Sequence, residues 1–176
     1  MANEAAGTPV HLRKILPPDE ARKAAAAAEA KAATFGRIVA LLMISPRHSK
    51  ITLSDLNLLV APPVALGQFA IVGAKHQEDG PVSIAAAVWW AFVSPEVDKQ
   101  LTASREDILR LEAGDWKSGD QPWIIEAIGE TRVVNELVAQ VARRNFKGKP
   151  AKLRAVSPEG KLGVALLGPK THKKEV

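Results

Sequence analysis

Two apolar runs on either side of a turn-rich hexapeptide constrain the fold of this chain most. The first run, QFAIVGAK, covers residues 68–75, and the second, VSIAAAVWWAFVS, covers residues 82–94. Between them lies HQEDGP, whose glycine and proline favour a turn. The apolar part of the second run, residues 82–93, is too short for a membrane helix, which needs about 20 apolar residues. The pattern therefore predicts a β-hairpin, and with it a sheet.

Helical patterns surround this hairpin. An alanine-rich segment, residues 19–34, begins with two acids, and the helix continues through FGRIVALLMI, residues 35–44, whose last seven residues are apolar. Pro46 disfavours a helical conformation at Ser45, so we expect the helix to end there. The other expected elements are a helix over 52–66 bent at Pro62-Pro63, a short helix over 94–101, a strand over 123–129, a helix over 131–146 and a final hairpin over 151–167 that turns at SPEG. This order predicts an α/β fold with one mixed sheet flanked by helices.

The composition changes along the chain and suggests three parts. Residues 1–34 are expected to form an N-terminal arm with an alanine-rich helix, because this stretch is of low complexity. Residues 35–168 carry the patterned sequence and are expected to form a single domain. Residues 169–176 are expected to form a basic tail.

Several common kinds of site are absent from the sequence. The chain has no cysteine, so it has no disulfide framework and no thiolate nucleophile. Its four histidines lack metal-ligand spacing, and neither a phosphate-binding glycine loop nor a nucleophile elbow is present. We therefore expect no metal and no bound cofactor. No signal peptide or membrane span is recognisable, and we expect a cytoplasmic protein.

The positive charge gathers in the last third of the chain. From Arg143 onward, ten lysines and arginines stand against two glutamates, a net charge of +8, whereas the whole chain carries +5. Such a patch attracts an acidic protein, nucleic acid or an anionic membrane surface, or it is simply a solvated tail. Nucleic acid is disfavoured because the cluster contains a single aromatic residue, Phe146, and so lacks a platform on which bases could stack.

Three blocks of sequence together resemble a known family. They are ISPRHSKITLSDLNLLVAPPVALGQFAIV (44–72), GPVSIAAAVWWAFVS (80–94) and AGDWKSGDQPWIIEAIGE (113–130). In these blocks, and over about residues 35–160, the chain is similar to the hemolysin-C-type lysine acyltransferases that activate RTX toxins. The resemblance implies a GNAT-like fold. It also implies transfer of a fatty acyl group from acyl-acyl carrier protein to internal lysine ε-amines of an RTX-type protoxin.

The resemblance also assigns residues. His48 matches the catalytic histidine of the family, Ser45 matches a nearby serine, and Glu126 stands where the family has a catalytic aspartate. Because the donor is a carrier protein, no coenzyme A loop is required, and the acidic carrier is expected to dock on the basic residues Arg143, Arg144, Lys147 and Lys149. Whether the protein forms a homodimer stays open.

Plainer interpretations of the same residues remain open. His48 can be a surface or capping residue, Glu126 the solvent-facing member of an alternating strand, and Ser45 a helix-terminating residue. The four tryptophans are most simply core residues, although one of them can line an acyl channel. The alternative function is that of a non-catalytic homologue that binds acyl carrier protein or a secreted partner.

The predicted chemistry requires a base, because a lysine amine with a pKa of about 10.4 is protonated at neutral pH and cannot attack a thioester. A histidine side chain can accept that proton.

Overall fold

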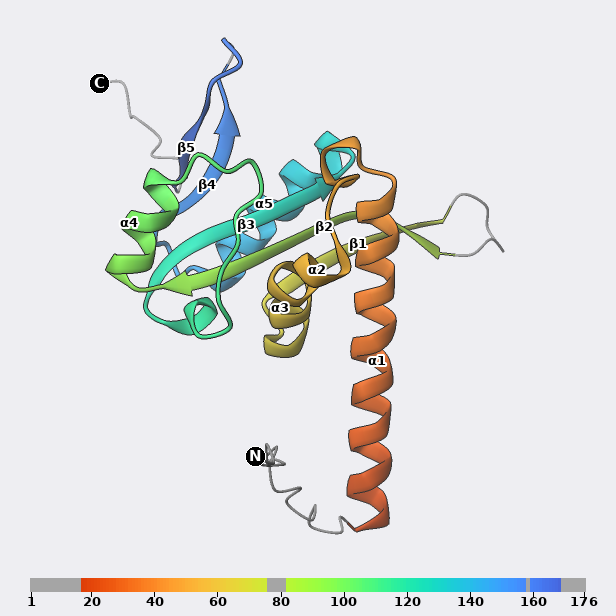
Figure 1. The fold of residues 1–176 in the computed structure, drawn as a ribbon. Helices are drawn as coiled ribbons and strands as arrows, with labels where there is room; N and C mark the ends of the chain where they lie inside the picture. The colour runs from red at the N-terminus through yellow and green to blue at the C-terminus, as the bar shows by residue number, and fades with distance from the viewer. Residues whose placement is uncertain (1–16, 76–81, 158, 169–176) are drawn as a thin grey trace, which may run out of the picture.

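The computed structural model describes residues 17–75, 82–157 and 159–168. Its elements are α1 (Pro18–Met43), η1 (Pro46–His48), α2 (Leu53–Leu59), α3 (Ala61–Leu66), β1 (Phe69–Lys75), β2 (Val82–Val93), α4 (Pro95–Ala103), η2 (Asp115–Lys117), β3 (Gln121–Gly129), α5 (Thr131–Asn145), β4 (Ala151–Val156) and β5 (Leu162–Leu167). Figure 1 shows a twisted central sheet with α1, α2 and α3 on one side and α5 on the other.

The strands form one sheet in the order β1-β2-β3-β4-β5. All neighbouring pairs are antiparallel except β3 and β4, which run parallel over two residue pairs. The helix α5 connects these parallel strands, as a crossover connection requires. The predicted α/β fold with a mixed sheet flanked by helices is therefore confirmed, and the arrangement is consistent with a GNAT-like single domain.

The alanine-rich segment belongs to one long helix, α1. Pro18 occupies its first turn, and Asp19 and Glu20 follow at the positive end of the helix dipole. Residues 17–33 are exposed, whereas the second half of the helix buries Ile38 and other apolar residues against the sheet. The first half extends away from the rest of the molecule (Figure 1). The predicted boundary between residues 34 and 35 thus falls within α1, although packing begins close to it.

The segment expected to be one bent helix over 52–66 forms two helices. The first, α2, begins with a capping box in which Thr52 and Asp55 bond to each other's backbone N–H groups. The break lies at Val60, before the two prolines rather than at them. Pro62 and Pro63 occupy the first turn of α3, where a missing N–H breaks no helical hydrogen bond.

Two cores lie on opposite faces of the sheet. On one face, α1, α2, α3 and α4 pack against alternate residues of β2, including Trp89. On the other face, α5 packs against the intervening residues, including Trp90. Since side chains alternate along a strand, one long strand supplies both cores.

Among the described residues, no helix combines the length and the apolar character needed to cross a membrane. The predicted N-terminal arm up to residue 16 and the predicted basic tail lie outside the described residues.

Candidate active site

The chain turns sharply after α1, and the turn directs His48 inward. Pro46 begins the short helix η1, since proline fits a first helical turn but not the interior of α1. The backbone N–H of His48 donates to the carbonyl of Ser45 at 3.0 Å. His48 is 3% exposed. The alternative of a surface or capping histidine is therefore wrong.

A bulge in β3 determines which face of the sheet carries Glu126. Trp89 of β2 lies opposite Glu126, and the next residue, Trp90, lies opposite Ile124. This register leaves Ile125 as an extra residue in β3. Opposite residues of an antiparallel pair point to the same face, so Glu126 shares the α1 face with Trp89.

The bulge has a direct consequence for the site. In a regular strand, residues two apart share a face, so Glu126 would have joined Ile124 under α5. With the extra residue, Glu126 instead faces η1. It is 4% exposed, and the alternative of a solvent-facing acid in an alternating strand is therefore wrong.

His48 and Glu126 are in direct contact. His48 Nε2 lies 3.2 Å from Glu126 Oε2, although 78 residues separate them in the chain. On the other side of the ring, Ser45 Oγ lies 2.8 Å from His48 Nδ1. The structure thus brings together all three residues that the sequence singled out, as one chain of hydrogen-bonded side chains. Their catalytic roles stay a prediction.

The contacts of Glu126 fix where the protons lie. Its Oε1 accepts from Arg47 Nη1 at 2.8 Å and from the backbone N–H of Ala127 at 3.0 Å. A carboxylate only accepts, so the hydrogen bond at Oε2 requires a proton on His48 Nε2. In the neutral form of the ring, Nδ1 accepts a hydrogen bond from the Ser45 hydroxyl. In this tautomer, Nδ1 is the basic nitrogen of His48, and it faces Ser45.

Arg47 is a site residue that the sequence reasoning missed. Besides Glu126, its guanidinium reaches Asp107 in the segment between α4 and η2. The Nε group donates to Asp107 Oδ2 at 3.3 Å and Nη2 donates to the Asp107 carbonyl at 2.6 Å. The only available signal was a charged residue between Pro46 and His48, which gave no indication of its partners.

Two hollows open on either side of this chain of side chains. Ser45 lines one of about 570 Å³, together with Leu41, Ile44, Pro46, Ser83, Ile84, Ala85, Ile128, Gly129 and Glu130. His48 lines the other, of about 350 Å³, whose remaining walls are Val39, Leu42, Met43, Ser49, Ile51, Thr52, Leu53 and Leu56. Both are predominantly apolar. Met43 and Leu53 at the second hollow are 77% and 84% exposed, which is unusual for large apolar side chains.

The four tryptophans belong to the cores, as the simpler interpretation held. Trp89, Trp116 and Trp123 are fully buried, and Trp90 is 6% exposed. None of them lines either hollow next to His48 and Ser45.

The block DWKSGD holds the end of β2. Ser118 Oγ accepts the backbone N–H of Ser94 at 2.8 Å, and the N–H of Gly119 donates to the carbonyl of Phe92 at 3.1 Å. A Cβ atom on Gly119 would lie 2.5 Å from the carbonyl oxygen of Val93, so no other residue fits without movement. The role of this sequence block is therefore structural, since it holds the end of β2 in place.

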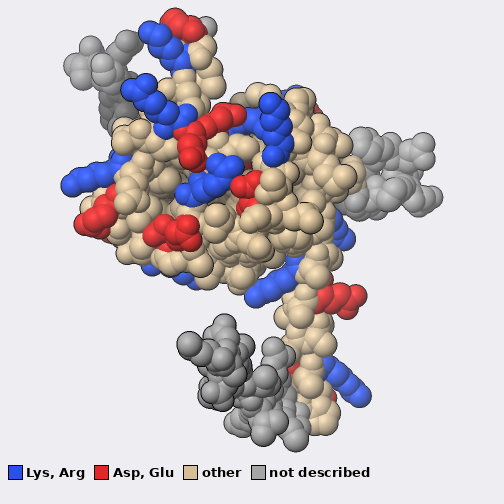
Figure 2. All heavy atoms as spheres, in the orientation of Figure 1, with Lys and Arg blue, Asp and Glu red and all other residues tan. Residues whose placement is uncertain are grey.

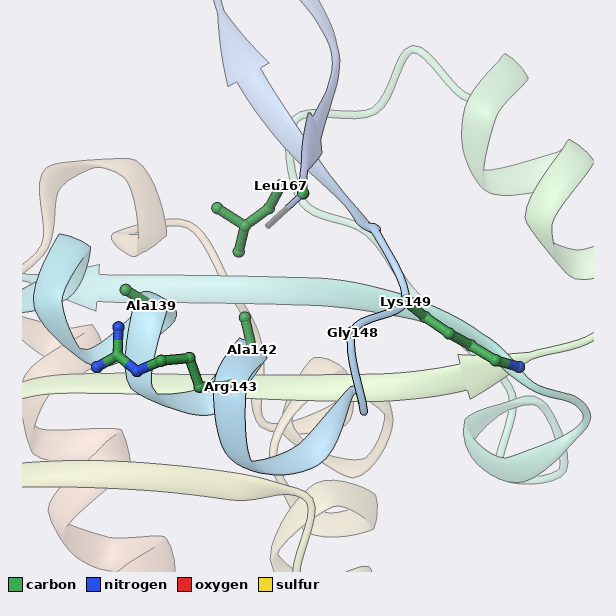
Figure 3. A pocket seen from close by; sticks show the side chains of 7 residues that line it. Ala139, Ala142, Arg143, Gly148, Lys149 and Leu167 are labelled. Atoms are coloured by element: carbon green, nitrogen blue, oxygen red, sulfur yellow. The ribbon is translucent and has the colours of Figure 1, made fainter. Parts of the chain in front are cut away.

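The residues predicted to bind a carrier protein lie on the side of the sheet that α5 covers, whereas His48 lies on the α1 side. Arg143, Arg144, Lys147 and Lys149 are all exposed. They lie at the C-terminal end of α5, on the opposite face of the sheet. Arg143 follows the first residue of α5 by twelve positions, which corresponds to about 18 Å along the helix axis. Figure 3 shows Arg143 and Lys149 extending in different directions from a hollow between α5 and β5.

One of these four cations is already paired. Lys149 Nζ lies 2.5 Å from Asp120 Oδ2, and this hydrogen bond and charge hold the pKa of Asp120 below its ordinary value. Arg143, Arg144 and Lys147 therefore carry most of the charge available to a partner. Figure 2 shows acidic and basic side chains interspersed on the face that it displays, with no large area of one sign.

Within residues 17–75, 82–157 and 159–168, no group of three or more histidine or acidic side chains is arranged to hold a metal ion.

Comparisons with known proteins show the family of the chain. The model of the HlyC family, described as the RTX toxin acyltransferase family, matches residues 27–166. The chain is 30% identical over 113 residues to the lysine-acyltransferase RtxC of Vibrio cholerae serotype O1, covering 64% of this chain and 68% of that protein. It is 28% identical over 130 residues to the RTX-I toxin-activating lysine-acyltransferase ApxIC of Actinobacillus pleuropneumoniae, covering 73% of this chain and 69% of that protein. Because the family match spans most of its length, the chain belongs to the RTX toxin acyltransferase family and is an acyltransferase.

Proposed function

We propose that this protein moves a fatty acyl group from acyl-acyl carrier protein to internal lysine ε-amines of an RTX-type protoxin. Family membership supports the reaction class. The observation that carries the proposal is the buried contact of 3.2 Å between His48 and Glu126, two groups brought together from distant parts of the chain. Buried, mutually hydrogen-bonded titratable groups beside a hollow are typical of acid–base sites.

The reaction needs one proton to be removed and then returned. The acceptor ammonium group first loses one proton to solvent. The neutral ε-amine then attacks the thioester carbonyl carbon, a C–N bond forms, and the carbonyl oxygen becomes an oxyanion. His48 Nδ1 takes a proton from the attacking nitrogen. The C–S bond then breaks, and the proton passes from His48 to the leaving thiolate. The products are an amide on the acceptor lysine and the free thiol of the carrier.

Ser45 and Glu126 serve His48 in different ways. Ser45 occupies Nδ1 in the free enzyme, and in our proposal its hydroxyl turns to the thioester carbonyl oxygen when substrate enters, which frees Nδ1 for the amine. Glu126 keeps the proton on Nε2 and stabilises the imidazolium that forms during transfer. Preorganised groups of this kind stabilise charge in the transition state without further reorganisation.

The acyl chain needs an apolar slot beside the base. In our proposal it lies in the smaller hollow, because six of its nine lining residues are apolar and His48 is among the others. The exposed side chains of Met43 and Leu53 would then be covered by the chain. The acceptor lysine enters through the hollow that Ser45 lines.

Docking of the carrier on the basic residues of α5 remains part of the proposal. Its support is the exposure of Arg143, Arg144 and Lys147 and the acidic character expected of a carrier. Docking at these residues requires the thioester to reach around the sheet from the α5 side to His48 on the α1 side. Docking there and chemistry at His48 are therefore separable in experiments.

The reaction itself can be tested directly. The full-length protein is incubated with acyl-acyl carrier protein and an RTX protoxin, and the protoxin is examined by peptide mass spectrometry. The proposal predicts an added acyl mass on internal lysines with the carrier-bound donor and much less with acyl-coenzyme A. Carrier binding without any lysine acylation would contradict it and favour the non-catalytic alternative.

A further inference from the structure

The side chain of Arg47 joins three parts of the molecule at the proposed site. It leaves η1 next to His48, contacts Glu126 on β3 and reaches Asp107 in the segment between α4 and η2. All three of its nitrogen positions are used, toward Glu126 Oε1, Asp107 Oδ2 and the Asp107 carbonyl. The Arg47 side chain is 37% exposed, whereas the Glu126 side chain is 2% exposed. A solvent-accessible cation is thus hydrogen-bonded to a buried acid.

The two oxygens of Glu126 have separate partners. Oε2 faces His48, while Oε1 accepts from Arg47 and from the backbone of Ala127. The terminal torsion of a glutamate is broad, so a single contact does not fix the plane of its carboxylate. Contacts at both oxygens do fix it. Among the described residues, Arg47 and His48 are the charged or titratable side chains recorded in contact with Glu126.

Glu126 has particular need of such a contact. Its side chain is one methylene longer than that of an aspartate and has one more rotatable bond. A longer acid has more orientations available, and only some of them direct an oxygen at His48 Nε2. Asp107 in turn holds the guanidinium from its far side, which orients Arg47 toward Glu126.

We infer that Arg47 is a positioning residue, which holds the Glu126 carboxylate in the orientation that keeps His48 in its reactive tautomer. The inference rests on the proposed function, because it assigns Arg47 a role in the same proton transfer. Arg47 contacts neither reactant in this account and acts only through Glu126. A purely structural role, in which Arg47 merely fastens the segment around Asp107 to η1, predicts different behaviour.

The chain contains a matched control for this distinction. Arg110 lies in the segment between α4 and η2, its side chain is 40% exposed, and it likewise bridges two carboxylates, those of Asp55 and Glu106. Neither carboxylate contacts His48 or Glu126. Arg47→Met and Arg110→Met therefore remove comparable cations and comparable ion pairs, but only the first removes a contact of the proposed site.

The experiment measures steady-state acyl transfer by the full-length variants across a range of pH, together with thermal unfolding. Misplacement by about 1 Å can lower a rate about 100-fold, so we expect Arg47→Met to lower kcat by about 10- to 100-fold with little change in KM. Its pH profile should differ from that of the wild type, because Arg47 is hydrogen-bonded to the acid partner of His48. Arg110→Met should keep the wild-type kcat and pH profile.

Two further variants sharpen the result. Arg47→Lys keeps the charge but not the planar fork, so it should recover only part of the rate. If Arg47 acts through Glu126, adding Arg47→Met to Glu126→Ala should cause little further loss, because both changes remove the same interaction. If the kcat of the double variant falls by the product of the two single-variant losses, Arg47 does not act through Glu126.

The inference and the proposed function fail in different ways. If Arg47→Met matches Arg110→Met in kcat and pH profile while His48→Ala is inactive, the positioning role is overturned and the proposed function stands. If His48→Ala transfers acyl groups at the wild-type rate, the proposed function itself fails, whatever Arg47→Met does.

Discussion

The two faces of the sheet share their central strands, yet only one of them buries polar side chains. The α1 face contains His48 and Glu126, and Gln68 is buried beside the same core. On the α5 face, the buried side chains of the described residues are apolar or aromatic, and Phe146 packs edge to face against Trp90. The first face combines a core with a polar cluster, whereas the second is a core alone.

This difference raises the question of why the α1 face contains buried polar groups, since burying them is unfavourable for stability. Burying a charged group is unfavourable unless it is paired, and replacing a buried ion pair by apolar residues is often neutral or stabilising. The stability of the fold therefore does not require a buried acid such as Glu126. The core on the α5 face is packed without one. The proposed function gives a reason to retain Glu126, because His48 as a base needs an oriented partner.

Phe146→Ala should have the largest effect on stability and test whether the α5 face is only a core. Phe146 is 2% exposed and contacts the rings of Trp90 and Phe92. Loss of a buried phenylalanine costs about 3–5 kcal/mol, so the free energy of unfolding, measured in urea, should fall by that amount. Under conditions in which the variant remains folded, its kcat for acyl transfer should match that of the wild type. A folded but inactive variant would contradict the separation of the two faces.

Glu126→Ala tests the opposite face, where the rate should respond more strongly than stability. Without the carboxylate, nothing keeps the proton on His48 Nε2, and we expect acyl transfer to fall by about 100-fold. Glu126→Asp supplies the shorter acid that the resemblance implies at this position, and this variant should retain or raise activity. Steady-state rates with acyl-acyl carrier protein measure both. If Glu126→Ala transfers acyl groups at the wild-type rate, Glu126 has no role in the reaction.

Asp98 of α4 should make a smaller contribution to the free energy of unfolding, and this contribution depends on pH. It accepts hydrogen bonds from Trp123 Nε1 at 2.7 Å and Lys152 Nζ at 2.8 Å. Burial opposes its ionisation, but the hydrogen bonds from Lys152 and Trp123 prevail and lower its pKa below 3.8. A lowered pKa adds stability above pH 3.8, and this stability is lost as the pH falls through the folded-state value.

Asp98→Asn should therefore destabilise the protein by about 1.5–3 kcal/mol at neutral pH, the value of a hydrogen bond to a charged group. The difference from the wild type should shrink as the pH falls below 3.8. Urea unfolding at a series of pH values measures it. A difference that stays constant into the acid range would show that Asp98 does not act through its charge.

Charge reversal at Arg143 and Arg144 should have the smallest effect, on carrier binding rather than on chemistry. Each exposed ion pair is worth about 0.2–1 kcal/mol, so the double reversal should raise KM for acyl-acyl carrier protein severalfold and leave kcat unchanged. The effect should weaken as salt rises, because the Debye length is about 8 Å at physiological ionic strength. Salt-independent carrier affinity would rule out docking at these residues.

Much of the fold follows from patterns within single segments. The helix end at Met43 follows from Pro46, the two hairpins follow from apolar runs around turns, and α5 follows from its apolar periodicity. The position of the break before α3 did not follow, because prolines that are excluded from a helix interior fit its first turn equally well.

The site was only partly predictable. The resemblance identified Ser45, His48 and Glu126, but strict alternation along β3 would have placed Glu126 on the wrong face. The extra residue at Ile125 results from pairing with β2, which no local pattern encodes. Arg47 was missed for a similar reason, since its partners lie 60 and 79 residues away in the chain.

The most direct test of the account is the rate of lysine acylation by His48→Ala. The variant should first be shown to be folded by circular dichroism and thermal unfolding. Its turnover with acyl-acyl carrier protein and protoxin is then compared with that of the wild type. General-base catalysis contributes about 100- to 10,000-fold, and the account predicts a loss in that range in a folded protein. Acylation by folded His48→Ala at the wild-type rate would contradict it.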